Sequence, residues 1–85
     1  MSETTKAEID LMRHSLGLSQ SAKPYRNYFA ATPMHSDMPT IRSLISKGMM
    51  FQGATRPSAH GDMTFYHVTD EGCALLGTTR AEAEN

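Results

Sequence analysis

The chain has 85 residues, of which 39% are hydrophobic and 20% are charged, with a formal net charge of −1. This composition is typical of one small folded domain and excludes a disordered chain. No apolar run approaches the roughly 20 residues that a membrane-spanning helix needs, and the N-terminus lacks the basic and apolar regions of a signal peptide. Because the single cysteine, Cys73, cannot form an internal disulfide, we expect a cytoplasmic protein without membrane contact.

The charge is unevenly distributed along the chain. Residues 13–56 contain six Lys or Arg residues and one Asp, a balance of +5, whereas residues 1–12 carry −2 and residues 57–85 carry −4. Such asymmetry can give a folded domain a basic face for an anionic partner. Ordinary solvated surface charge is an equally good interpretation.

Residues 5–16 are predicted to form the first helix. Ile9, Leu11, Met12 and Leu16 fall near a stripe with helical periodicity, and acidic residues in the N-terminal half suit the helix dipole. Gly17 is well placed to end this helix.

The next segment has two interpretations. Pro24 is compatible with a first helical position, so residues 25–31 are predicted as a short second helix. An extended structure is nearly as well supported, because the Tyr and Phe residues of this segment favour strands.

A third helix is predicted over residues 37–47. Ser36 or Asp37 can cap its first turn, where Pro39 removes no required donor. Gly48 supplies the left-handed cap at its end. The buried face is formed by apolar side chains at helical spacing: Met38, Ile41, Leu44 and Ile45.

Two short strands are predicted after this helix, at about residues 49–53 and 63–68. A Gly- and Pro-containing loop over residues 54–61 joins them. Thr69 can then cap a helix that ends at Gly77.

We expect a single domain, residues 1–85, with an ordered core over residues 5–77. Both ends, residues 1–4 and 78–85, are expected to be flexible, although residues 80–84 could also continue as a helix.

Few residues indicate chemistry. The four histidines, His14, His35, His60 and His67, match no ligand spacing on one helical face, and one cysteine cannot supply a thiolate cluster. Cys73 lies in a predicted helix, where a buried and inert thiol is the common outcome. No phosphate loop or nucleophile motif is present, so we expect neither an enzyme nor a bound metal or cofactor.

Two groups of residues are candidates for binding. The outward side of the third helix carries short polar residues and basic residues of the kind that read the major groove, and Arg56 would lie on the wing. Its candidate DNA-binding residues are Thr40, Arg42, Ser43, Ser46 and Lys47. A solvated helix face is the alternative interpretation.

The aromatic segment supplies the second group. Rings beside Arg and Asn can stack on bases or anchor a protein partner, which makes Tyr25, Arg26 and Asn27 candidate partner-binding residues. Tyr28 and Phe29 can equally belong to the core, with the preceding residues at its margin.

From Met38 to Gly77 the chain resembles winged-helix regulators of the MarR and PadR kinds. The resemblance rests on Ile41 to Met49, as recognition helix and first strand, and on Tyr66 to Gly72, as the strand-to-helix exit. It implies an α+β, winged helix-turn-helix-like fold with three helices, a two-stranded hairpin wing and a C-terminal helix. The long dimerisation helix of those regulators has no counterpart here.

The whole chain also resembles small uncharacterised proteins of phages and prophages. We therefore expect a phage- or prophage-type regulatory protein that docks helix 37–47 and wing 54–61 on duplex DNA, as a dimer or beside a partner. The alternative is a winged-helix module that binds a host or phage protein without DNA. One continuous basic face would favour DNA, and an exposed Met and Tyr patch would favour a protein partner.

Overall fold

The computed structural model of the protein describes residues 4–59 and 61–84, which contain four helices and one three-stranded antiparallel sheet. The α+β class is therefore confirmed. In chain order the elements are α1 (Lys6–Leu16), β1 (Phe29–Ala31), α2 (Met38–Ser46), β2 (Met50–Arg56), β3 (Met63–Val68), α3 (Asp70–Leu75) and α4 (Arg80–Glu84).

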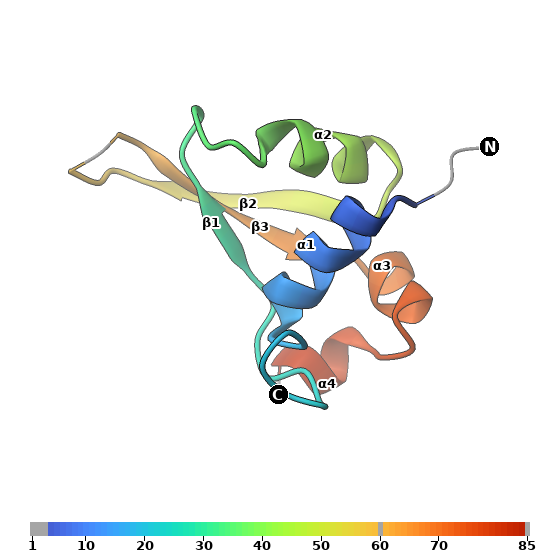
Figure 1. The fold of residues 1–85 in the computed structure, drawn as a ribbon. Coiled ribbons are helices and arrows are strands. Elements are labelled where there is room, and N and C mark those ends of the chain that lie inside the picture. Colours follow the sequence, from blue (N-terminus) through green and yellow to red (C-terminus); the bar gives the residue numbers. More distant parts are fainter. Residues whose placement is uncertain (1–3, 60, 85) are drawn as a thin grey trace.

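The sheet has the strand order β1-β3-β2, so both other strands pair with β3. On one side Phe29 lies opposite Tyr66, and on the other side Met50 lies opposite Val68. The β2–β3 hairpin extends beyond the helices at the left of Figure 1.

The core lies between the sheet and the first two helices. α1 and α2 pack against each other and against β3 and β2, respectively (Figure 1). Along β3, Tyr66 and Val68 are buried on this face, so Phe65 and His67 point to the opposite face of the sheet. The fully buried side chains include Met12, Leu16, Ile41, Leu44, Met50, Val68 and Cys73.

α1 begins one residue later than predicted and ends at Leu16 as predicted, and local signals define both ends. The Thr5 hydroxyl oxygen accepts a hydrogen bond from the Glu8 backbone N–H, and the Glu8 carboxylate accepts one from the Thr5 backbone N–H. These two bonds form a capping box. Gly17 follows in the left-handed conformation, with φ 83°. A side chain there would also collide with the ring of Tyr25, because a Cβ atom would lie 2.4 Å from that ring. The left-handed backbone favours glycine here, and the half-exposed ring of Tyr25 would have to shift to admit a side chain.

The predicted second helix is wrong, and its extended alternative is correct. Residues 24–28 have no regular structure, and β1 follows at Phe29. The reason is tertiary: β3 has a free side, and pairing with residues 29–31 satisfies backbone groups that would otherwise lack partners. This strand is the one that the sequence prediction lacked.

The later elements follow the prediction more closely. α2 begins at Met38 rather than at residue 37, and Gly48 has the expected positive φ of 75°. Ile45, expected on the buried face, is 36% exposed. β2 continues to Arg56, three residues beyond its predicted end.

The C-terminal segment, expected to be flexible or helical, forms α4 over Arg80–Glu84. Ala83 is buried, and the Glu84 carboxylate accepts a hydrogen bond from Asn27 Nδ2 at 2.8 Å. α4 is therefore attached to the loop that precedes β1. Residues 1–3, which belong to the N-terminal end expected to be flexible, lie outside the described residues.

Candidate functional site

Fewer of the side chains predicted to bind DNA face solvent on α2 than the sequence suggested. Arg42 and Ser46 are exposed, and Thr40 is half-buried. Ser43 and Lys47 instead turn toward α1, where both donate hydrogen bonds to the carboxylate of Glu8. The expectation that these two side chains face outward is wrong.

Glu8 explains this arrangement. Its side chain is only 3% exposed, and Lys47 Nζ lies 2.7 Å from its Oε1. Burial by itself raises the pKa of Glu8, but hydrogen bonds from Lys47, Ser43 and the Thr5 backbone outweigh it and lower the pKa to about 2. A buried carboxylate requires such partners, so Ser43 and Lys47 connect α2 to α1.

In the β2–β3 hairpin, the exposed basic side chain near the tip is that of Arg56. Arg56 is exposed at the end of β2, opposite Met63 on β3. Within residues 4–59 and 61–84, neither Arg56 nor Arg42 forms a hydrogen bond or an ion pair with another side chain. His60, part of the predicted wing, lies outside the described residues.

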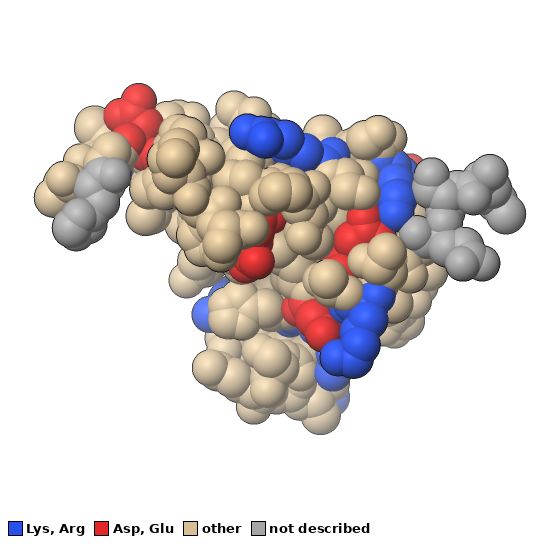
Figure 2. All heavy atoms as spheres, turned by 45° about the horizontal axis from the view of Figure 1, so that its top comes forward, with Lys and Arg blue, Asp and Glu red and all other residues tan. Residues whose placement is uncertain are grey.

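Lys23 is exposed, and three of the other basic residues are bound to neighbours at separate places. Lys6 pairs with Asp10 on α1, and Arg80 pairs with Glu84 on α4. Arg13 donates to the carbonyl oxygen of Leu18. Figure 2 shows Lys and Arg in several separate places on one face of the molecule, with Asp and Glu between them. That face carries no continuous basic surface.

Asn27 has an internal role. Its side chain is buried, accepts a hydrogen bond from the Val68 backbone N–H at 2.7 Å and donates to the Val68 carbonyl at 3.1 Å. The side-chain amide of Asn27 thus makes the two backbone hydrogen bonds that a neighbouring strand would make with Val68, the last residue of β3. Both of its amide N–H groups donate internally, to Val68 and to Glu84, so its contact with an external partner stays a prediction that these bonds do not favour.

The neighbouring side chains form an exposed aromatic surface, defined here as Tyr25, Arg26, Tyr28 and Phe65. The guanidinium carbon of Arg26 lies 5.4 Å from the ring centroid of Tyr25 and 5.5 Å from that of Tyr28. The ring of Phe65 lies 6.0 Å from that of Tyr28. Tyr25 and Tyr28 are 49% and 45% exposed. Thus two of the three predicted partner-binding residues, Tyr25 and Arg26, lie together.

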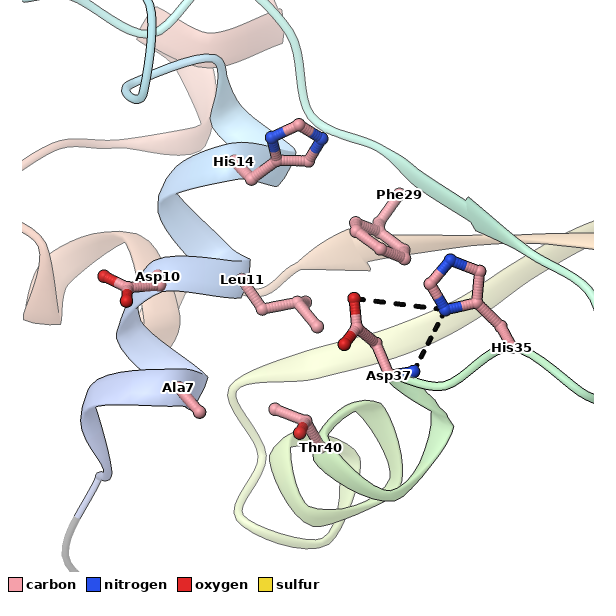
Figure 3. Close-up of a pocket in the computed structure, with 8 residues that line it drawn as sticks. All are labelled: Ala7, Asp10, Leu11, His14, Phe29, His35, Asp37 and Thr40. Carbon is pink, nitrogen blue, oxygen red and sulfur yellow. Dashed lines mark hydrogen bonds and ion pairs between the residues drawn. The ribbon is translucent and has the colours of Figure 1, made fainter.

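A pocket of about 430 Å³ opens between α1, β1 and the start of α2 (Figure 3). The ring of Phe29 lies between two imidazoles, 5.8 Å from that of His14 and 5.5 Å from that of His35. The carboxylate of Asp37 points toward the space between Phe29 and His35. The lining residues are Ala7, Asp10, Leu11, His14, Phe29, His35, Asp37 and Thr40.

A second hollow, of about 360 Å³, lies between the outer face of the sheet and α4. There the ring of Phe51 lies 5.2 Å from that of His67, and the guanidinium of Arg80 lies 5.3 Å from the Phe51 ring. Asn27 and Glu84 complete its lining. Arg80 is already bound to Glu84, so this hollow offers little free charge.

Sequence reasoning missed Glu8 and the α1–α2 pocket. The pattern Thr5-x-x-Glu8 was visible as a capping box, and Glu8 falls on the same helical side as Leu11 and Met12. A carboxylate on an apolar stripe indicates a partner from another element. The pocket had no such signal, because its walls come from segments far apart in the chain.

Other chemistry is limited in the described part of the chain. No group of three or more His, Cys, Asp or Glu side chains there could hold a metal ion, and no helix is long and apolar enough to cross a membrane. Cys73 is fully buried, and burial, followed by the charge of Asp70, raises the pKa of its thiol. Both effects disfavour the thiolate, which is the reactive form of cysteine.

Comparisons with known proteins give no family assignment. The chain matches no model of a protein family, and no curated protein or solved structure is significantly similar to it.

Proposed function

We propose that this protein is a small winged-helix-type module that binds an acidic segment of a partner protein. The order of its elements supports the winged-helix assignment, because α2 is followed directly by the β2–β3 hairpin and β1 pairs with β3. Turns over residues 33–37 occupy the place of the second helix in the usual pattern.

The aromatic surface carries the proposal. Tyr and Arg are, with Trp, enriched at the energetically dominant positions of protein interfaces, where they supply large contact areas and hydrogen bonds. Here Arg26 is already held between two rings and donates to the His14 carbonyl oxygen at 2.8 Å. Such an ordered stack loses little entropy when a partner binds.

Charge favours an acidic partner. Residues 11–36 contain Arg13, Lys23 and Arg26 and no Asp or Glu. Lys23 is exposed close to Arg26 in the chain, and Arg13, in the last turn of α1, donates to the Leu18 carbonyl oxygen. Carboxylates on an extended partner segment would find complementary charge beside rings that exclude water.

Selection from a random peptide library would test this proposal. We expect the selected peptides to be enriched in Asp and Glu, and Tyr28→Ala to weaken their binding about 30-fold, which corresponds to the roughly 2 kcal/mol of an interface hot spot. Fluorescence anisotropy with labelled selected peptides measures the effect.

Met34→Ala is the matched control, because Met34 is an exposed apolar residue at 92% exposure outside the aromatic surface. It should leave affinity unchanged. Peptides without acidic preference, or equal binding by Tyr28→Ala, would refute the proposal. Saturable binding of oligothymidine in place of peptides would assign the surface to single-stranded nucleic acid instead.

Duplex DNA is the second candidate partner, favoured by one observation. Arg42 on α2 and Arg56 on the hairpin are exposed and form no ion pair within the described residues, and the two elements adjoin each other in the chain. Ser46, one helical turn after Arg42, would lie beside it in this docking geometry, whereas Thr40 lines the pocket between α1 and α2.

An anisotropy titration with mixed-sequence duplex at low salt would test the DNA candidate. Binding should be weak and strongly salt-dependent, and Arg42→Ala with Arg56→Ala should reduce the slope of log affinity against log salt by about 1.8, roughly 0.9 for each lost phosphate contact. Lys6→Ala, which removes a cation paired with Asp10, is the matched control. No binding at low salt would exclude this function.

A further inference from the structure

The pocket between α1 and α2 has a chemistry of its own, independent of the proposed function. We propose that it binds a small organic cation, an amine or guanidinium group on a short aliphatic chain. Its volume of about 430 Å³ falls at the lower end of the range typical for ligand sites, which suits a small ligand. The cation can be a free molecule or the side chain of an Arg or Lys residue.

Asp37 supplies the negative charge. It occupies the N-cap position of α2, where an Asp side chain normally accepts a hydrogen bond from the first turn. Here the side chain forms no such bond, and the carboxylate points into the pocket instead (Figure 3). The helix thus forgoes a stabilising contact, which leaves this carboxylate available for a cation.

His35 holds Asp37 in place without neutralising it. The Asp37 backbone N–H donates to His35 Nδ1 at 3.0 Å, so this nitrogen acts as an acceptor and the neutral ring carries its proton on Nε2. The Asp37 carboxylate lies 3.9 Å from the same Nδ1, a contact that becomes an ion pair only when the imidazole is protonated (Figure 3). A bound cation would meet the negative charge of this half-exposed carboxylate.

The other walls suit the rest of such a ligand. Phe29 presents an aromatic ring held nearly perpendicular to two imidazoles, and aromatic rings attract cations. Ala7 and Leu11 on α1 offer apolar contact for a short aliphatic chain. These side chains and Asp37 come from separate elements, so a ligand would contact both helices at once.

The charge balance excludes the opposite kind of ligand. The lining contains Asp10 and Asp37 and no Lys or Arg, so an anion would be repelled. Asp10 points away from Asp37 in Figure 3 and is paired with Lys6 at 3.2 Å. Asp37 is therefore the carboxylate that selects the cation.

Two-dimensional NMR titration of the full chain with agmatine at pH 7.5 would test the site. We expect saturable shifts centred on Phe29, His35 and Asp37, with affinity in the millimolar range. Asp37→Asn should weaken binding at least about tenfold, the scale of a hydrogen bond to a charged group. Because the Asp37 side chain forms no capping bond, this variant should keep the dispersed spectrum of the folded protein.

Three controls make the result decisive. Asp62→Asn removes an exposed carboxylate outside the pocket and should bind agmatine as the wild type does. Neutral n-butanol should not bind. Blocked arginine amide distinguishes the sources: affinity equal to that of agmatine favours a side chain of a partner, and weaker binding favours a free amine. Unsaturable or scattered shifts, or equal binding by folded Asp37→Asn, would overturn the proposal.

Discussion

Replacement of Lys47 by Met is expected to lower the free energy of unfolding by about 3 kcal/mol, the usual cost of removing one partner of a buried ion pair. Lys47 Nζ lies 2.7 and 3.0 Å from the two carboxylate oxygens of Glu8, which is almost completely buried. Without Lys47, the carboxylate keeps its Ser43 and Thr5 partners among the described residues. Methionine retains the length of the side chain, so lost packing contributes little.

Thermal unfolding followed by circular dichroism would measure this effect. For a domain of this size, 3 kcal/mol corresponds to a fall in Tm of roughly 12–24 °C. Arg42→Met is the matched control, because it removes a cation from an exposed position of the same helix and should change stability by at most about 0.5 kcal/mol. Similar losses in the two variants would contradict the buried pair.

The same pair predicts the response to acid. The pKa of Glu8 in the folded protein, about 2, lies below its ordinary value of 4.5. Its contribution to stability is therefore fully present above about pH 4.5 and is lost as the pH falls toward 2. In Lys47→Met this acid-dependent loss should be smaller, because the pKa of Glu8 moves back upward.

Replacement of Asn27 by Asp is expected to destabilise the fold by about 3 kcal/mol at neutral pH. The change removes the Nδ2 group, which donates to the Val68 carbonyl at 3.1 Å and to the Glu84 carboxylate at 2.8 Å. A second carboxylate would then lie against Glu84 in a buried position. The two like charges would repel each other, and the 41% exposure of the Glu84 side chain lets water screen part of that repulsion.

A double-mutant cycle with Glu84→Gln would isolate this repulsion. In the Asn27→Asp background, Glu84→Gln should restore part of the lost stability, since the new amide can donate to Asp at position 27. Gln52→Glu is the control for added charge, because it places a carboxylate on the exposed part of β2. Denaturation by urea measures all four free energies. Absence of rescue would mean that the Asn27–Glu84 contact does not form.

The candidate site could be predicted only in part. Arg42 and Arg56 are exposed as the sequence suggested, and Tyr25 and Arg26 do lie together on the surface. Asn27 belongs to the same segment but is buried, and composition alone does not distinguish it from its exposed neighbours. The direction of each side chain depends on where the segment meets β3.

The sequence by itself determined those elements whose ends depend on hydrogen bonds and backbone conformations within a few residues. The capping box at Thr5, the left-handed Gly17 and Gly48, and the Thr69 cap act within a few residues, so they define three helices without knowledge of the fold. The β2–β3 hairpin likewise depends on neighbouring residues.

Only the tertiary structure decided the rest, because it depends on contacts between distant residues. Asn27 meets Val68 across 41 positions, which makes residues 29–31 a strand. Glu8 meets Lys47 across 39 positions, which turns a predicted DNA-contacting side chain toward the core. Burial of unpaired polar groups is costly, so these long-range partners override the local preferences of both segments.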